Sequence, residues 1–334
     1  MLEIVEAEAR TDMCAFFKAA KDVGYLKKEE KYLRRYAVPP LSLLSQNGPQ
    51  FFLIAKRDGK PVFRALTGVD WRYIQKEKVK TGYFSLFDGE KDREACTAVL
   101  DAILKKQRDW GMDEVIGPIS PDGSGFFMGA GEGDFGKERG AFTGPDSAFA
   151  CGILRESGFA EKQVENAYEI SLDGKNPLFE LTRKAEERFR VNVARMETGV
   201  FSDAWIRNIL AVSKHAPERE LRLLLERIRP FIDKKHSYTA FMGGACAGYL
   251  VSLKSGKEGV LRATTLITSA DCFSAPAALC LIGRYLEDAK KRGVRSFEIS
   301  VINSQNVRSE RLALRYGARK IRSYTLFTKK VGQN

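Results

Sequence analysis

Residues 297–331 read FEISVINSQNVRSERLALRYGARKIRSYTLFTKKV. The pattern predicts a strand over 297–299, a short helix that ends at Gly317, and a final strand. A glycine is expected at a helix end because it adopts a positive φ without a Cβ clash. The first half has the same order: a strand over 114–116, a short helix ending in ESGF at Gly158, and a last strand. The chain therefore repeats one pattern of strands and helices.

Two β-hairpins extend this repeat toward the start of each half. Residues 51–66, FFLIAKRDGKPVFRAL, predict two apolar strands around an Asp-Gly turn. Residues 238–253, YTAFMGGACAGYLVSL, predict two more around a Gly-Gly turn. In each half a further strand and a long amphipathic helix follow the hairpin. We expect these strands at 83–87 and 260–267, and we expect the helices to end at Gly111 and Gly293.

This repeated order predicts the fold class. Hairpin, strand, helix, strand, helix and strand, with helices before the hairpin, give an α/β (α+β) domain, a mixed β-sheet flanked by helices on both faces. The strands on either side of the long helix are expected to be parallel neighbours joined by a right-handed crossover. A chain of 334 residues suits two such domains. We place them at 1–172 and 173–334, divided at the turn-rich stretch DGKNP (173–177).

Composition narrows the class of protein. Hydrophobic residues make up 44% and charged residues 29% of the chain, the balance of a soluble globular protein. The best apolar run, 275–283, is about half of the roughly 18 residues that a membrane span needs. The acidic start MLEIVEAEAR is unlike a signal peptide, and the six cysteines form no CxxC pair, so we expect a cytoplasmic protein with reduced thiols. The only two histidines, His215 and His236, argue against a histidine-rich metal site.

Charge is distributed unevenly along the chain. Residues 1–172 carry 25 Lys and Arg against 27 Asp and Glu, whereas residues 173–334 carry 30 against 16. The second half therefore holds the whole basic excess behind the net charge of +12. Such a surface attracts an anionic partner, which could be a nucleic acid, a phosphorylated cofactor or an acidic peptide. Lys and Arg also solvate helix faces without any partner, so charge alone leaves both interpretations open.

A glycine-rich segment interrupts the repeat in the first half. Residues 123–144 contain eight glycines, with G-x-G-x-x-G at 131–136 and most of a P-loop at 131–137. Both nucleotide-binding motifs need a strand before and a helix after them, and neither context is predicted here. The first half is longer than the second over this part, so we interpret 120–145 as an insertion that forms a long loop.

Short motifs of the second half resemble those of the GNAT superfamily of N-acetyltransferases. GNAT domains show a strand, an Asn opening the next helix, a glycine closing it and a final strand, and Asn306 and Gly317 stand at the matching places in 297–331. Residues 82–118 resemble the leading domain of bacterial tandem-GNAT proteins. The resemblance implies two tandem GNAT-like domains, with the insertion closing over the interior of the first and lining a substrate pocket.

The resemblance also implies an acetyl-CoA site in the second domain. In GNAT domains the loop that opens the long helix binds the cofactor pyrophosphate through backbone N–H groups and the helix dipole. The matching stretch 88–95 of the first half contains four carboxylates, which would repel a pyrophosphate. In the second half small side chains permit close approach, although Pro276 lacks an N–H. The residues expected to bind the cofactor there are Cys272, Phe273, Ser274, Ala275 and Ala277.

Transfer to an amine requires a base for the attacking ammonium and an acid for the leaving thiolate. Glu298, on the strand beside the expected cofactor groove, is the candidate base, unless it pairs with a neighbouring arginine. GNAT domains often place a catalytic tyrosine where this chain has Ala313, so Tyr316 is the substitute candidate. Asn306 contacts the cofactor or caps its helix. The resemblance thus predicts an acyl-CoA-dependent N-acyltransferase acting on an amine of a small molecule or peptide.

Two other functions stay open. The departures from the GNAT motif favour a catalytically silent protein of this fold that binds a ligand or partner. Fem-type transferases, which use aminoacyl-tRNA, also pair two GNAT-like domains, and a basic second half would suit tRNA. Binding of RNA that falls steeply with added salt would favour this last function.

Overall fold

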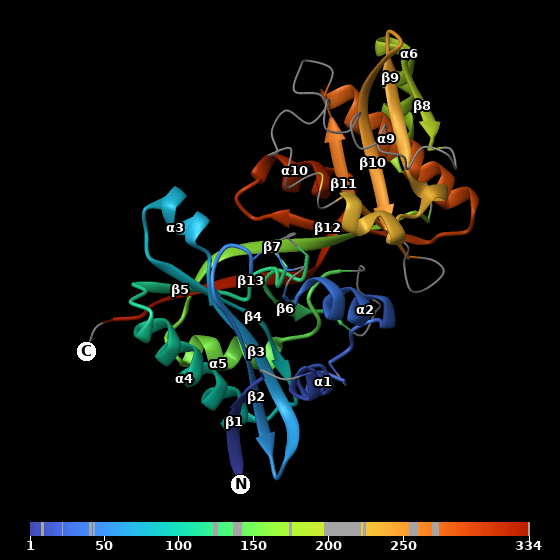
Figure 1. The fold of residues 1–334 in the computed structure, drawn as a ribbon. Helices are drawn as coiled ribbons and strands as arrows, with labels where there is room; N and C mark the ends of the chain where they lie inside the picture. The colour runs from blue at the N-terminus through green and yellow to red at the C-terminus, as the bar shows by residue number, and fades with distance from the viewer. Residues whose placement is uncertain are drawn as a thin grey trace. The chain divides into compact units, whose positions relative to one another are not determined.

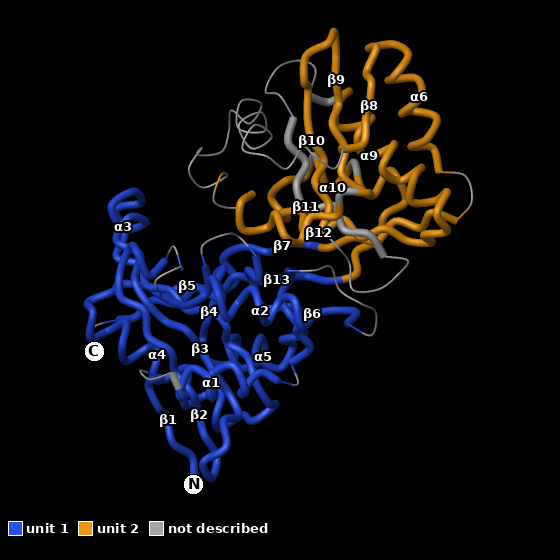
Figure 2. Tube along the Cα trace, turned by 45° about the vertical axis from the view of Figure 1, so that its right-hand side comes forward, with its two compact units in different colours: residues 1–166, 322–334 blue, residues 167–321 orange. Residues whose placement is uncertain are grey.

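The chain forms two compact units in a computed structural model (Figures 1 and 2). Unit 1 comprises Met1–Asn166 together with Arg322–Asn334, and unit 2 comprises Ala167–Ile321. The residues that the structure describes are 1–7, 10–21, 23–39, 42, 44–122, 126–135, 142–173, 176–196, 222, 225–253, 260–268 and 274–332.

Unit 1 contains the predicted order of elements. Its sheet runs β1-β2-β3-β4-β5-β13, and β6 also pairs with β13. Neighbours are antiparallel except β4 and β5, which are parallel and joined through α4 as the sequence predicts. The elements are β1 (Leu2–Glu6), α1 (Arg10–Lys18), α2 (Lys27–Tyr36), β2 (Gln50–Arg57), β3 (Lys60–Val69), α3 (Trp71–Glu77), β4 (Thr81–Gly89), α4 (Arg93–Asp109), β5 (Glu114–Gly117), β6 (Ala130–Gly133), α5 (Ala148–Glu156) and β7 (Ala160–Ser171).

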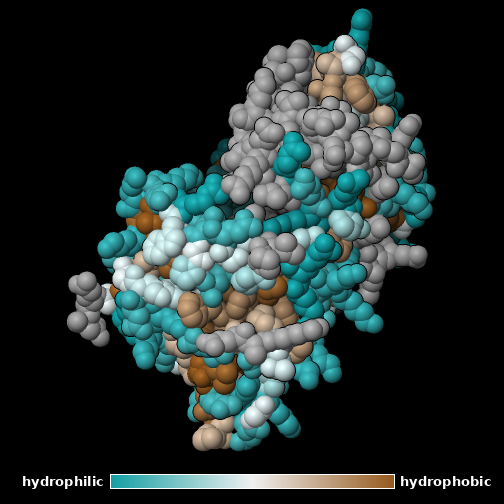
Figure 3. Space-filling model, in the orientation of Figure 1, coloured by the Kyte–Doolittle hydropathy of each residue, from teal (hydrophilic) through white to brown (hydrophobic). Residues whose placement is uncertain are grey.

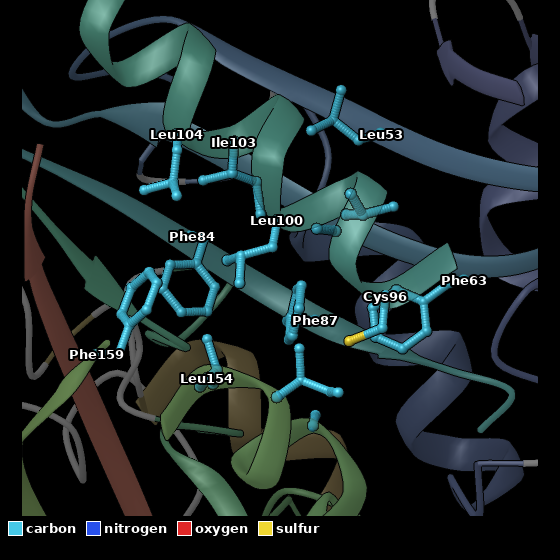
Figure 4. Packing of buried hydrophobic residues seen from close by; sticks show 14 of the residues in the cluster. Leu53, Phe63, Phe84, Phe87, Cys96, Leu100, Ile103, Leu104, Leu154 and Phe159 are labelled. Atoms are coloured by element: carbon cyan, nitrogen blue, oxygen red, sulfur yellow. The ribbon is translucent and has the colours of Figure 1, made fainter. Parts of the chain in front are cut away.

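Helices cover both faces of this sheet (Figure 1). On one face α4 and α5 bury an apolar cluster against the strands, in which Phe84, Leu100 and Phe159 point toward one another (Figure 4). On the other face α1 packs on the hairpin, where the ring of Phe16 meets that of Phe52 edge to face at 5.1 Å. Alternating side chains of the strands therefore have apolar partners on both sides.

Unit 2 repeats the plan. Its sheet runs β7-β12-β11-β10-β9-β8, and β11 and β12 are its parallel pair. Helix α6 packs on α9 so closely that a Cβ at Gly283 would lie 1.8 Å from the Oγ1 of Thr182. The elements after β7 are α6 (Pro177–Phe189), β8 (Val191–Arg195), two 3-10 turns (Arg229–Phe231 and Lys234–His236), β9 (Tyr238–Met242), β10 (Ala245–Leu253), β11 (Val260–Thr268), α9 (Ser274–Lys291), β12 (Ser296–Asn303), α10 (Val307–Arg315) and β13 (Arg319–Lys330).

The local predictions for both halves are confirmed. Both hairpins form, and the four glycines expected to close helices have φ between 68° and 81°. Residues with a Cβ avoid this left-handed region of φ, whereas glycine adopts it freely, so the helices end at these glycines. The glycines are Gly111, Gly158, Gly293 and Gly317.

The last strand of each half departs from a simple division of the chain at 172 and 173. Strand β13 pairs antiparallel with β5 of unit 1, from Phe327 opposite Gly117 to Lys330 opposite Glu114. Strand β7 lies beside β12 of unit 2, and the amide of Leu172 donates to the carbonyl of Arg295 at 2.8 Å. The chain thus passes from unit 1 to unit 2 within β7 and returns within β13. An open strand edge is completed by any strand of fitting register, whatever its place in the sequence.

The glycine-rich insertion is more structured than the predicted loop. Its residues 130–133 form β6, which pairs with 322–325 of β13. On either side of β6, Phe126 and Phe142 are buried, and their rings lie 5.1 Å apart. The high glycine content of the segment gave no indication of these buried aromatic residues.

Among the helices in the described ranges, none combines the length and the hydropathy that a membrane span requires.

Candidate functional site

The parallel strands of unit 2 diverge at their carboxyl ends. β11 and β12 pair from Val260 opposite Ser296 to Ala263 opposite Ile299. Both strands continue beyond this register, β11 to Thr268 and β12 through 303, while β11 stays paired with β10. In the described part of the chain the β11–β12 register covers these four pairs, and the strand ends beyond it carry backbone N–H and C=O groups that this register does not use.

Helix α9 begins beside this opening. It follows β11 in the chain, and the carboxyl end of a parallel strand and the start of its crossover helix lie at the same edge of a sheet. The first turn, 274–277, contains no acidic residue. Ala277 is fully buried among Cys280, Leu281 and Phe297, which fixes the helix start on the sheet. The positive end of the helix is therefore available to an anion.

The other predicted cofactor residues are only partly placed. Cys272 and Phe273 lie outside the described residues. Ser274 and Ala275 form the first turn of α9. Asn306 accepts a hydrogen bond from the amide of Ser309 at 3.1 Å, so it caps α10, as one of its two predicted roles requires.

The two catalytic candidates lie on different elements of unit 2. Glu298 belongs to β12 and is only 2% exposed. Its neighbours Phe297 and Ile299 pack in the apolar cluster around α9, so the alternation of a strand directs Glu298 to the opposite face. Tyr316 packs against that same cluster, beside Ala313.

A polar cluster that the sequence did not indicate anchors α9 near its carboxyl end. Asp288 of α9 accepts hydrogen bonds from Arg195 of β8 at 2.7 Å and from Tyr238 of β9 at 2.9 Å. Burial alone would raise the pKa of Asp288, but these two hydrogen bonds lower it below its ordinary value. Burial and the neighbouring carboxylate raise the pKa of Tyr238 to about 12. Asp288 is thus an anion that ties the helix to the edge strand β8 and to its neighbour β9.

The corresponding helix start in unit 1 is already occupied by the protein's own carboxylates. Asp92 caps α4 by accepting from the amide of Ala95 at 3.1 Å. Arg57 donates to Asp92 at 2.7 Å and to Glu94 at 2.8 Å. The hydrogen bond from Arg57 lowers the pKa of Asp92 below its ordinary value, so this carboxylate is ionised at neutral pH. A pyrophosphate would meet two negative charges here, as the sequence predicts.

The end of β4 in unit 1 is also filled. Asp88 accepts from Arg64 at 2.7 Å and from the hydroxyl of Tyr25 at 2.6 Å. Arg64 is 1% exposed, and its guanidinium lies 5.0 Å from the centre of the Phe16 ring. In the sequence Arg64 is a charged residue within an apolar strand. Its partners could not be recognised there, because Tyr25 and Asp88 are 63 residues apart in the chain.

Backbone atoms close the space between β4 and the segment after β5. The amide of Ile119 donates to the carbonyl of Phe84 at 2.8 Å, and the hydroxyl of Ser85 donates to the carbonyl of Ile119 at 2.6 Å. The groups that a ligand would use between these strands are therefore paired within unit 1. Of the two units, unit 2 has the open arrangement in its described part.

The insertion packs onto α2 within unit 1. Tyr32 donates to Asp122 at 2.6 Å, and its ring meets that of Phe142 at 5.1 Å. Buried Glu29 accepts from the amide of Phe142 at 2.6 Å. These contacts join the described parts of the insertion to α2. That the insertion lines a substrate pocket stays a prediction.

Comparison with known proteins identifies the fold. No protein-family model and no curated protein matches the sequence. Among solved structures, a tandem GNAT protein from the clavulanic acid biosynthesis pathway, solved without acetyl-CoA, is 13% identical over 100% of both chains with a TM-score of 0.62.

Two further solved structures share the fold. A glucosamine N-acetyltransferase region of a fungal multi-domain GH3 β-N-acetylglucosaminidase is 14% identical over 98% of this chain and 38% of that one, with a TM-score of 0.62. A GCN5-related N-acetyltransferase from Sphaerobacter thermophilus is 13% identical over 100% of this chain and 96% of that one, with a TM-score of 0.54. The chain therefore has the tandem GNAT fold, as its sequence resemblance predicts.

Proposed function

We propose that the protein is an acyl-CoA-dependent N-acyltransferase, with acetyl-CoA held by unit 2 and an amine of a small molecule or peptide as acceptor. The observation that carries this proposal is the divergence of β11 and β12 beside the start of α9. Solved proteins of this fold that are described as N-acetyltransferases support the reaction class. The cytoplasmic placement expected from the sequence belongs to the same proposal.

In this proposal the start of α9 holds the pyrophosphate. The backbone N–H groups of Ser274, Ala275 and Ala277 are assigned to it, while Pro276 has no N–H to donate. Cys272 and Phe273 complete the loop before the helix. Serine and alanine have short side chains, which favours close approach of a phosphate, and no carboxylate in the first turn opposes it.

Glu298 is assigned as the base. Acetyl-CoA would supply a thioester carbonyl to be attacked. The amine forms the new N–C bond as the C–S bond breaks, its proton passes to Glu298 directly or through water, and the leaving thiolate takes up a proton. Tyr316 is the candidate donor of that proton. Because Tyr316 packs beside Ala313, its hydroxyl would reach the thiolate less easily than a water molecule would.

A second candidate function is a catalytically silent protein that binds a ligand or partner. The filled strand end in unit 1, with Asp92 capping α4 and Arg64 bound to Asp88, favours this function for that unit. The tRNA-dependent alternative rests on the paired GNAT-like domains and on the basic second half.

Calorimetric titration with acetyl-CoA and free CoA tests the proposal. We expect micromolar binding to the wild-type protein. Ala275→Glu should weaken it roughly tenfold or more relative to Ala275→Gln, a matched variant that adds similar bulk without charge, because a carboxylate opposes pyrophosphate at a helix start. No binding at millimolar cofactor, or equal loss in both variants, would contradict the assignment.

Turnover separates the base from the binding site. If Glu298 takes the proton, Glu298→Gln should retain acetyl-CoA affinity and lose about 10²-fold or more in turnover once an amine acceptor is found by screening. Full turnover in Glu298→Gln would remove Glu298 from the mechanism. Salt-dependent binding of tRNA without any binding of CoA would favour the Fem-type function instead.

A further inference from the structure

We propose that unit 1 carries a second binding site, for a carboxylic acid with an apolar body, in a cavity between α1, α2 and the edge of its sheet. The cavity has a volume of about 800 Å³ and is bounded by residues of β1, α1, α2 and β2. Small-molecule sites have volumes of roughly 300–1,000 Å³. Strand β3 separates β1 and β2 from β4 in the sheet, and neither Arg64 nor Asp88 lines the cavity, although the ring centre of Phe17 in its wall lies 5.5 Å from the guanidinium of Arg64. The inference does not depend on acyl transfer.

Aromatic and aliphatic side chains form most of the wall. Phe17 of α1 and Phe52 of β2 are buried, and Val38 and Phe51 line the cavity beside them. Apolar side chains reach the surface of unit 1 on the face shown in Figure 3, bordered by hydrophilic residues. An apolar ligand body would be transferred from water onto these rings, which is the main favourable contribution in such sites.

One cation at the cavity has no counter-ion among the residues that the structure describes. The guanidinium of Arg34 lies 4.5 Å from the centre of the Phe17 ring, and it forms no ion pair with any described residue. The carboxylate that lines the cavity, Glu6, is bound to Lys106 at 2.7 Å. Lys106 in turn lies 4.1 Å from the centre of the Phe51 ring. The pair is neutral overall, so Arg34 gives the cavity a positive charge.

The geometry of Arg34 selects the class of ligand. The cation–π contact with Phe17 keeps the guanidinium beside the aromatic wall, so less side-chain entropy is lost when its N–H groups bind an anion. A carboxylate accepts two parallel N–H groups from an arginine. An aryl or alkyl carboxylic acid would therefore place its charge on Arg34 and its body against Phe17 and Phe52.

Cys14 provides a reporter at the cavity wall. It lines the cavity with an exposed thiol, whereas Cys246 in unit 2 is half-buried and serves as an internal control. The experiment measures alkylation of both cysteines by iodoacetamide, with peptide mass spectrometry, in the presence of 4-phenylbutanoate or of 4-phenylbutanol. The two probes share one apolar body and differ in the carboxylate.

We expect 4-phenylbutanoate to slow alkylation of Cys14 saturably and to leave Cys246 unchanged. The alcohol should protect about five- to tenfold more weakly, since it lacks the charge-assisted hydrogen bonds. Arg34→Met should remove this difference, and Arg34→Lys should retain part of it. Because Arg34 is exposed, both variants should unfold at the wild-type temperature, which a thermal scan checks.

Three results would overturn the proposal. The first is alkylation of Cys14 that millimolar 4-phenylbutanoate does not slow. The second is equal protection by the acid and the alcohol, or by the acid in wild type and Arg34→Met, since either removes the anion from the recognition. The third is equal protection by inorganic phosphate, which would mean that the apolar wall takes no part.

Discussion

Phe327→Ala is expected to destabilise unit 1, although Phe327 lies almost at the end of the chain. Its side chain is fully buried in the apolar cluster of unit 1, with Phe84, Phe87 and Phe159. Replacing a buried phenylalanine by alanine costs about 3–5 kcal/mol, because both the transfer free energy and the surrounding packing are lost. A loss of about 3 kcal/mol corresponds to a roughly 100-fold larger population of the opened unit.

Hydrogen exchange followed by mass spectrometry locates that loss. In Phe327→Ala, amides of α4 within unit 1 should exchange roughly 100-fold faster, while amides of α9 within unit 2 should change much less. Phe297→Ala is the matched control, because Phe297 is buried in the cluster of unit 2 beside α9. In this control the faster exchange should appear in α9 rather than in α4.

The pair of variants can refute the placement of β13. Faster exchange of α9 and unchanged exchange of α4 in Phe327→Ala would mean that β13 packs with the second half. Equal effects of both variants on both helices would mean that the two units do not open separately. Either outcome would overturn the division of the chain at Asn166 and Arg322.

Three further predictions concern stability, each measured by urea denaturation. Gly283→Ala should cost about 1–3 kcal/mol, because its Cβ would lie 1.8 Å from the Oγ1 and 2.6 Å from the Cβ of Thr182. Gly152→Ala, in α5, has no atom within 4 Å of the added Cβ and should stabilise unit 1 by about 0.5–1 kcal/mol, so a loss there would contradict the packing. Asp288→Asn should cost about 1–2 kcal/mol at neutral pH by weakening the bonds from Arg195. The pKa of Asp288 is lowered in the folded state, so its ionised form stabilises the fold above the ordinary pKa of 3.8, and this stabilisation is lost as the pH falls below that value. The difference in unfolding free energy between wild type and Asp288→Asn should therefore disappear in acid. A difference that does not change with pH would exclude ionisation of Asp288 as its cause.

Local sequence patterns determined the elements of this fold. The Asp-Gly and Gly-Gly turns fixed the two hairpins, and the glycines at 111 and 293 ended the long helices, because each pattern acts over a few neighbouring residues. The parallel pairing of β4 with β5 and of β11 with β12 followed from the crossover helix between them.

The candidate site was predictable to the extent that it follows these elements. The repeat placed the start of α9 at 274–277 and Glu298 on the next strand. The face on which Glu298 lies depends on the register of β12 against β11, which sequence alone does not fix.

Tertiary structure alone decided which strands complete each sheet and which charges are neutralised. The sequence predicts a final strand in each half, but β13 pairs with β5 while β7 lies beside β12. Likewise Arg64 finds Asp88 and Tyr25 only when β3, β4 and the segment before α2 come together. A local pattern determines whether a segment can become a strand or carry a charge. Its partner is determined by competition among all open edges and charges in the folded chain, and that competition involves residues far apart in sequence.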